Sequence, residues 1–203
     1  VVIRDIPDSK KNSKRLESGD IVVERSGGSA DQPVGRVLFF YLDGEYYHGN
    51  FLRQLRPDTS KINSRYLYYR LDYDYRRGHT KPLQTNTTNI RNLQYDSYLN
   101  QDVSVPSKSQ QRKIATVLYT ADQAIEKTKE IIEQTHSVKN ALIQDLFHGR
   151  HKNFEDNQST PVGEIPTHWS VASIGDVVHT AQYGISESLS EEGQYPIFRM
   201  NNI

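Results

Sequence analysis

The stretch from residue 107 to residue 148 constrains the fold more than any other, because its pattern predicts a single helix of about forty residues. Its seam positions are spaced alternately four and three residues apart: Ile114, Leu118, Ala121, Ile125, Thr128, Ile132, Thr135, Lys139, Leu142 and Leu146. This heptad spacing is typical of a helix that supercoils on another helix. At about 1.5 Å per residue the helix would be about 60 Å long, so we interpret it as a spacer rather than a core element.

The apolar face of this helix is wider than pairing with one helix requires. A second stripe runs beside the seam and consists of Val117, Ala124, Ile131 and Val138. We therefore expect a further protein neighbour beside the partner helix. The residues expected to pack on the partner helix are Ile114, Leu118, Ile125, Ile132, Leu142 and Leu146. Since the chain has no second helix pattern of similar length, the partner must come from another molecule or from sequence outside this chain.

Sequence signals mark both ends of the helix. Ser107 and Gln110 fit a capping box directly after Pro106, and Gly149 suits the left-handed residue that closes a helix.

Three polar residues, Thr128, Thr135 and Lys139, interrupt the apolar seam. They are either tolerated imperfections, or they fix the register against one particular partner helix. The sequence leaves both readings open.

Composition narrows the class of protein without identifying it. The 203 residues correspond to one or two domains, and the absence of cysteine excludes a disulfide framework and a thiolate metal site. The formal charge of zero is divided as +3 over residues 1–105, +2 over 106–150 and −5 over 151–203. No signal peptide or membrane-length apolar run is evident, so we expect a cytoplasmic protein with no membrane partner. The chain begins at Val1 in an apolar run, and we expect it to be a fragment of a longer protein.

Residues 1–105 are predicted to form a β-rich domain with one helix. Strands are expected at residues 16–23, 34–42, 46–55 and 100–105, with Val37, Leu38, Phe39 and Phe40 buried on both sheet faces. A helix capped by Asn63 or Ser64 should run to Arg77, end at Gly78 and present Leu67, Tyr68 and Leu71 to the core. Residues 84–89 are expected to form a polar loop. Ten of the thirteen tyrosines lie between Tyr41 and Tyr98, which fits either an amphipathic core or a recognition surface.

The chain after the long helix is predicted to begin a further domain. Residues 151–162 are polar and typical of a linker. Residues 163–203 are predicted to contain a helical turn or short strand near Ile174 and a strand at 195–199. Because about forty residues are too few for an independent core, this segment begins another domain or completes one elsewhere.

The sequence lacks recognisable catalytic signatures. It contains no Walker-type loop, no dinucleotide-binding glycine pattern, no His-Glu-x-x-His and no Gly-x-Ser-x-Gly. We therefore expect no catalytic residue, no metal site and no cofactor in this chain.

Several motifs, taken in order, resemble one protein family. They lie at residues 16–29, 32–37, 83–93, 103–106 and 110–115, and again at 165–169, 174–176 and 183–184. Together they are similar to the DNA-specificity subunit of type I restriction–modification enzymes. One departure is Gln110, which stands where the family usually has an acidic residue.

The resemblance implies an α+β fold in which each recognition domain is followed by a long helix. Residues 1–105 would be the later part of a β-rich target-recognition domain with a small helix, and residues 106–150 a coiled-coil spacer helix. Residues 151–162 would be a linker, and 163–203 the start of a second recognition domain. A less favoured arrangement is a permuted single repeat, in which residues 163–203 form the first part of the same recognition domain that residues 1–105 complete.

The resemblance also implies a function and its partners. The chain would help to recognise a bipartite site on double-stranded DNA and direct methyltransferase and restriction subunits to it. S-adenosylmethionine, ATP and magnesium would be bound only by those partner subunits. A second spacer helix would come from a missing repeat or another copy. The alternative is a truncated protein that does not bind DNA and associates only through its helix.

Three groups of residues are candidates for contacting DNA. The glycine-rich group is Arg25, Ser26, Gly27, Gly28 and Ser29. The alternative interpretation is that these residues form a strand-to-strand turn and do not contact DNA. The basic group is Arg76, Arg77, His79 and Lys81. The alternative interpretation is that these residues are a solvated helix end, where basic side chains also suit the helix dipole. The polar group is Gln84, Thr85, Asn86, Thr87 and Asn89. The alternative interpretation is that these side chains only cap the turn that leads into Ile90. Basic side chains suit phosphates, and amides and hydroxyls suit base edges.

Overall fold

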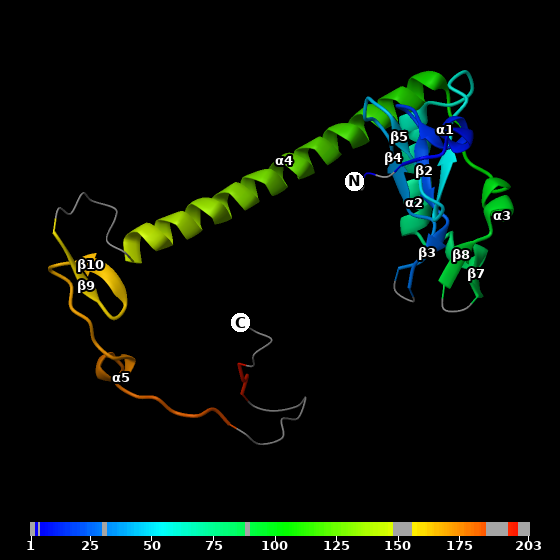
Figure 1. The fold of residues 1–203 in the computed structure, drawn as a ribbon. Coiled ribbons are helices and arrows are strands. Elements are labelled where there is room, and N and C mark those ends of the chain that lie inside the picture. Colours follow the sequence, from blue (N-terminus) through cyan, green and yellow to red (C-terminus); the bar gives the residue numbers. More distant parts are fainter. Residues whose placement is uncertain are drawn as a thin grey trace. The chain divides into compact units, whose positions relative to one another are not determined.

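The computed structural model describes Ile3 and residues 5–29, 32–87, 90–147, 156–185 and 195–198, with only the backbone of Thr87. The chain forms two compact units, Val1–Ile132 and Glu133–Ile203. The long helix α4 (Lys108–Phe147) begins in the first unit and ends in the second. Figure 1 shows the order of the elements along the chain.

The first unit combines short helices with small antiparallel sheets. The helices before α4 are α1 (Asp8–Lys14), α2 (Ser64–Arg76), the 3-10 helix η1 (Lys81–Leu83) and α3 (Tyr95–Leu99). The strands are β1 (Arg15–Leu16), β2 (Ile21–Glu24), β3 (Ser26–Gly27), β4 (Val37–Phe39), β5 (Tyr46–Tyr47), β6 (Leu52–Leu55), β7 (Gln84–Thr87) and β8 (Ile90–Leu93). They pair in the orders β4-β2-β6, β3-β8-β7 and β1-β5.

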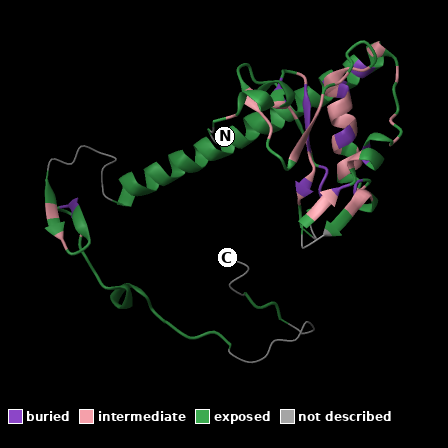
Figure 2. Cartoon of the chain, turned by 45° about the vertical axis from the view of Figure 1, so that its right-hand side comes forward, coloured by how far each residue is buried: buried purple, intermediate pink, exposed green. Residues whose placement is uncertain are grey.

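Strand β2 is the centre of the first unit. Ile21 lies opposite Phe39 of β4 on one side and Leu55 of β6 on the other. Ile21 and Val23 pack in one apolar cluster, and Val22 packs in another on the opposite sheet face. Because all three side chains are buried, β2 is the strand covered on both faces, as Figure 2 shows.

The expectation that residues 37–40 are buried on both faces was wrong. Leu38 is 59% exposed, whereas Phe40 is buried. The reason is that β4 is an edge strand, and Leu38 does not belong to the apolar cluster that buries Val22 and Phe40. An apolar run therefore identified a strand but not its place in the sheet.

Helix α2 agrees with its sequence signals. The side chain of Asn63 accepts a hydrogen bond from the backbone N–H of Tyr66 at 2.9 Å, which is an N-cap. After the helix, Gly78 has a φ of 80°, a conformation that favours glycine. Leu71 is buried in the main cluster, with Leu67 and Tyr68 packed against it. The predicted cap, end and core face are thus confirmed.

Several strand boundaries differ from the predictions. Residues 16–23 are divided between β1 and β2 by a turn at Gly19, and residues 46–55 between β5 and β6. Residues 100–105 pair with no strand, and the expected loop at 84–89 begins as β7 of the β7–β8 hairpin. Among residues 195–199, the described positions 195–198 form no strand. Apolar content did not reveal which extended segments find a partner.

A buried ion pair stabilises the start of β2. Asp20 is 1% exposed and accepts bonds from the guanidinium of Arg56 at 2.9 Å and the backbone N–H of Glu17 at 2.7 Å. Burial alone would raise the pKa of Asp20, but hydrogen bonds from Arg56, Glu17 and Gln54 outweigh it and lower that pKa. Asp20 is therefore a charged structural residue of the fold.

Helix α4 confirms the predicted long helix and its cap. The backbone N–H of Ser107 donates to Oε1 of Gln110 at 3.0 Å, and the backbone N–H of Gln110 donates to the Ser107 hydroxyl at 3.4 Å. This reciprocal pair is a capping box. Residues 148–150, which include the predicted end at His148 and Gly149, lie outside the described residues.

The first turns of α4 are anchored on α2. Gln111 is 1% exposed; its amide N–H donates to the Pro106 carbonyl and its Oε1 accepts from the Asn63 backbone N–H, both at 2.7 Å. The Arg65 guanidinium lies 4.1 Å from the ring centre of Tyr119 and also stacks on Phe39. These contacts fix the helix to the β-rich part of the first unit.

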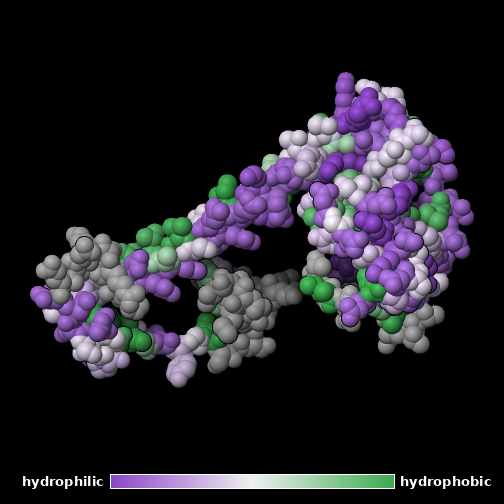
Figure 3. Space-filling view, turned by 45° about the horizontal axis from the view of Figure 1, so that its top comes forward, coloured by the Kyte–Doolittle hydropathy of each residue, from purple (hydrophilic) through white to green (hydrophobic). Residues whose placement is uncertain are grey.

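Beyond this anchor, the seam residues of α4 are exposed. The six predicted partner contacts, Ile114, Leu118, Ile125, Ile132, Leu142 and Leu146, are 40–54% exposed. Figure 3 shows hydrophobic patches along the helix, and Figure 2 shows it exposed over most of its length. The predicted coiled-coil partner is not part of this chain's described structure.

The second unit contains a β-hairpin where a linker was expected. Strands β9 (Asn157–Thr160) and β10 (Gly163–Pro166) pair antiparallel, so the part of the 151–162 segment that the structure describes is mostly not a linker. The side-chain amide of Gln158 donates to the Trp169 carbonyl at 2.6 Å, which ties the hairpin to the following segment. A helical turn, α5 (Ile174–Val177), follows and confirms one of the two readings for that segment.

Candidate nucleic-acid interface

The glycine-rich group forms a tight connection between strands. The buried hydroxyl of Ser26 donates to Oδ1 of Asn92 at 2.6 Å, which ties β3 to β8. Gly28 has a φ of 59°, and a Cβ there would lie 2.8 Å from the Gln32 carbonyl oxygen. Gly27 also has positive φ, and the hydroxyl of Ser29 accepts from the Gln32 backbone N–H. The loop therefore needs its glycines for folding, and Gly28 and Ser29 remain exposed.

The basic group at the end of α2 is partly neutralised. Arg76 donates to Asp72 at 2.7 Å, and a ring nitrogen of His79 lies 3.2 Å from Asp74. Arg77 and Lys81 are exposed and form no ion pair among the described residues. Arg77 and Lys81 are therefore the cations of this group that are available to a phosphate.

The polar group lies mostly on the β7–β8 hairpin. Gln84 is half-buried and donates to the Thr80 carbonyl, so it supports η1. Thr85 and Asn86 are exposed, and the Thr85 hydroxyl lies 3.4 Å from the Asn92 carbonyl. The side chain of Thr87 and the whole of Asn89 lie outside the described residues. Thr85 and Asn86 are thus the members of this group that can reach a ligand.

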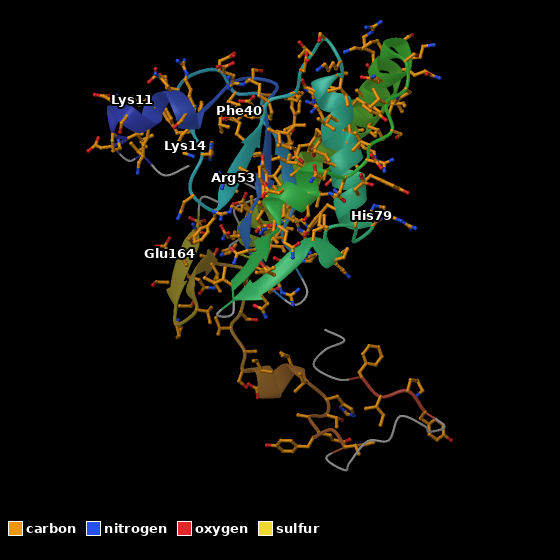
Figure 4. All side chains as sticks on the ribbon, turned by 90° about the vertical axis from the view of Figure 1, so that its right-hand side faces the viewer. Lys11, Lys14, Phe40, Arg53, His79 and Glu164 are labelled. Atoms are coloured by element: carbon orange, nitrogen blue, oxygen red, sulfur yellow. The ribbon has the colours of Figure 1, made fainter. Side chains whose placement is uncertain are left out.

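A cleft that sequence reasoning missed lies beside α1. Its volume is about 1320 Å³, and its lining comes from α1, the β5–β6 connection and the residue before β3. We name it the α1 cleft and define it by Lys10, Lys14, Arg25, His48 and Arg53. Figure 4 shows Lys14 and Arg53 on one side of the first unit and His79 on the other. The cleft contains one predicted residue, Arg25.

Strand pairing assembles the α1 cleft. Strand β1 pairs with β5, with Arg15 opposite Tyr47, and the backbone N–H of His48 donates to the Lys14 carbonyl at 3.1 Å. The backbone N–H of Arg25 donates to the Phe51 carbonyl at 2.8 Å, which brings that residue to the same connection. A sequence signal existed, because Lys10, Lys11, Lys14 and Arg15 lie within six positions. Neither α1 nor a role for this cluster is among the predictions from the sequence.

The described residues show neither a membrane-crossing helix nor a metal cluster. No helix among them combines the length and apolarity that crossing a bilayer requires. In the same part of the chain, no group of three or more histidine, cysteine, aspartate or glutamate residues could hold a metal ion.

Comparison with known proteins identifies the kind of domain. The family model described as "Type I restriction modification DNA specificity domain" matches residues 6–135. This match covers the β-rich part of the first unit and continues into α4.

Two proteins of Methanocaldococcus jannaschii are similar to the chain. One is named as the MjaX type I restriction enzyme specificity subunit; it is 26% identical over 200 residues, which cover 95% of this chain and 46% of the relative. The other is named as the MjaVIII type I restriction enzyme specificity subunit; it is 29% identical over 98 residues, 47% of this chain and 22% of the relative. The chain thus spans less than half the length of either relative.

Proposed function

Because the chain belongs to the type I restriction modification DNA specificity family, we propose that it recognises a particular sequence of double-stranded DNA as part of a specificity subunit. The observation that carries this proposal is the family match over residues 6–135. The matched residues include both the β-rich part of the first unit and the anchored first part of α4. Exposed polar loops on a rigid β scaffold support it, since such loops commonly carry binding residues.

Each candidate group has a role that suits its chemistry. Thr85 and Asn86 can hydrogen-bond base edges, which is how sequence is read directly. Arg77 and Lys81 are suited to phosphate contacts, which set position and supply affinity. In the glycine-rich loop, the exposed backbone at Gly28 permits close approach to DNA. Arg76 and His79 contribute through their ion pairs with Asp72 and Asp74, which hold the end of α2.

The proposal extends to a bipartite site and a larger complex. The first unit reads one half-site, and a second recognition domain, begun by residues 163–203, reads the other. Methyltransferase and restriction subunits supply the chemistry and bind S-adenosylmethionine, ATP and magnesium. This chain is the non-catalytic, DNA-reading component.

The exposed seam of α4 favours a partner helix. Six apolar side chains at heptad spacing are 40–54% exposed, which is costly unless another helix covers them. We propose that the spacer helix of a second repeat, or of another copy, packs along this seam as a coiled coil. The second stripe, from Val117 to Val138, is the face for the methyltransferase subunit.

The same exposed seam also favours a second candidate function. In this alternative, the chain does not bind DNA and serves only as a helical interaction partner. Association through α4 without any salt-dependent DNA binding would select it.

Salt-dependent binding tests the main proposal. Fluorescence anisotropy of the 203-residue chain with labelled duplex should show log affinity falling linearly with log salt concentration. The double variant Arg77→Ala with Lys81→Ala should bind all sequences more weakly and flatten the slope by about one to two. The matched control, Lys127→Ala with Lys129→Ala on α4, removes the same charge and should leave the slope unchanged. Absence of duplex binding by the unmodified chain would contradict the proposal.

A further inference from the structure

The α1 cleft gathers cations that have no carboxylate partner. The three half-buried charged residues in its lining, Lys14, Arg25 and Arg53, form no ion pair among the described residues. Elsewhere in the first unit, Arg36 and Arg56 are both paired with carboxylates. Partial burial of an unpaired charge is unfavourable, so an anion entering the cleft would gain interactions that the protein itself does not supply.

Acidic residues also line the cleft, but they lie at its surface. Asp5, Asp43 and Glu45 belong to the lining, and all three are exposed. Charges in water are screened strongly, whereas half-buried charges keep more of their field. The inner part of the cleft is therefore positive even though its formal charge is nearly balanced.

His48 reports the same positive potential. Burial lowers the pKa of His48, and the nearby charges of Lys14 and Arg53 lower it further, against a hydrogen bond to the Gly49 carbonyl. The imidazole is thus neutral at pH 7 and adds no charge of its own to the cleft.

The described residues leave Arg53 only partly satisfied. Its guanidinium lies 5.4 Å from the ring centre of Tyr95, and its buried Nε has no hydrogen-bond partner. A buried donor without an acceptor is uncommon in folded proteins, so the described part of the protein leaves the hydrogen-bonding capacity of this side chain partly unused.

A strand connects the cleft lining to the candidate base-reading hairpin. Arg25 immediately precedes β3, where Gly27 lies opposite Arg91 of β8, and Arg91 lies opposite Asn86 of β7. One small sheet therefore connects the cleft lining to the exposed side chain of Asn86. The volume of about 1320 Å³ also exceeds what a single phosphate ion needs.

We propose that the α1 cleft is a phosphate-binding surface that holds the backbone of duplex DNA while the β7–β8 hairpin reads the adjacent bases. This inference rests on the proposed function and adds Lys10, Lys14, His48 and Arg53 to the DNA interface. Lys14, Arg25 and Arg53 neutralise phosphates, and His48 lines the cleft beside them as a neutral ring.

Charge-removing variants test the cleft directly. The triple variant Lys14→Gln, Arg25→Gln and Arg53→Gln should bind duplex about 10- to 100-fold more weakly at 100 mM salt and flatten the salt slope by about two to three. The charge-matched control replaces three exposed α4 residues, Lys113, Lys127 and Lys129, with glutamine and should bind as the unmodified chain does. Circular dichroism checks that each variant is folded.

Two further experiments test the cleft even if the triple variant does not fold. Lys10→Gln with Lys14→Gln changes only α1, which has no buried residue, and should flatten the slope by about one to two. The chain has no cysteine, so Asn50→Cys in the cleft lining can carry a single thiol-linked photocrosslinker. It should crosslink duplex several-fold more than Asn100→Cys, an exposed residue outside the lining.

The outcomes separate the two proposals. If the unmodified chain binds duplex and the cleft variants match the control, the cleft assignment fails while DNA recognition stands. If the unmodified chain binds no duplex, both fail together. Equal affinity of the cleft for polyglutamate and for duplex would assign it to an acidic peptide and overturn the proposal.

Discussion

Replacing Gln111 with alanine tests whether the recognition domain is fixed to the long helix. Gln111 is 1% exposed and joins three parts of the fold, since it accepts from the Asn63 backbone N–H and donates to the Pro106 carbonyl. Asn63 is also the N-cap of α2. One side chain thus connects the start of α2 to the start of α4.

The magnitude follows from the two bonds that the substitution removes. Each net hydrogen bond contributes about 0.5–1.5 kcal/mol, and each buried backbone group left without a partner costs about 1–3 kcal/mol. Asn63 and Pro106 are only half-buried, so water can partly replace the lost contacts. We expect Gln111→Ala to lower the free energy of unfolding by about 2–4 kcal/mol, which for a chain of this size corresponds to about 5–15 °C in Tm.

Chemical and thermal denaturation followed by circular dichroism measure this change. Gln123→Ala is the matched control, because Gln123 is exposed on the same helix and should change stability by less than about 0.5 kcal/mol. If Gln111→Ala and Gln123→Ala are equally stable, Gln111 does not anchor the helix, and the argument for a rigid mounting is refuted.

Three further predictions concern the fold and its partner. Gly28→Ala should lower the free energy of unfolding by about 1–3 kcal/mol because Gly28 has a positive φ. Gly49→Ala is the control and should be nearly neutral in the same denaturation assay. Equal free energies of unfolding for the two variants would refute the strain argument. The folded-state pKa of Asp20 is lowered, so its stabilisation is present above pH about 4 and lost as pH falls. Asp20→Asn should therefore cost about 2–3 kcal/mol at pH 7 and less near pH 3 in denaturant melts, and a pH-independent difference would contradict this. Ile125→Asp with Ile132→Asp should abolish association through α4 in sedimentation while the first unit stays folded, and intact assembly would argue against the seam.

The features that the sequence predicted well depend on short-range patterns. The length of α4, its capping box and the cap and core face of α2 each arise from residues within a few turns of one another. Apolar spacing and capping chemistry act locally, so they can be read without knowing the rest of the fold.

The features that the sequence did not predict depend on long-range pairing. Residues 84–87 have a polar sequence, yet they form a strand because residues 90–93 fold back on them. Residues 100–105 look equally suited to a strand, but they pair with no neighbouring strand. The carbonyl of Ser104 instead accepts a hydrogen bond from the Tyr66 hydroxyl at 2.8 Å. Whether an extended segment becomes a strand is decided by its neighbours.

The α1 cleft illustrates the same limit for the candidate site. Lys14 and Arg53 are far apart in sequence, and both line the cleft because β1 pairs with β5 and β6 follows directly. Sequence clustering favoured the end of α2, where two of the four basic residues already have carboxylate partners. A cluster in sequence does not show which charges remain available, whereas the fold does.

Selection from a random pool of duplex DNA tests the central claim most directly. The 203-residue chain would be incubated with duplexes carrying a randomised segment, and bound molecules would be recovered and sequenced over several rounds. The account predicts that one short motif is enriched and that single mismatches in it weaken binding by about 1–3 kcal/mol each. Recovery of an unenriched pool, with all duplexes bound equally or none bound, would contradict sequence-specific recognition.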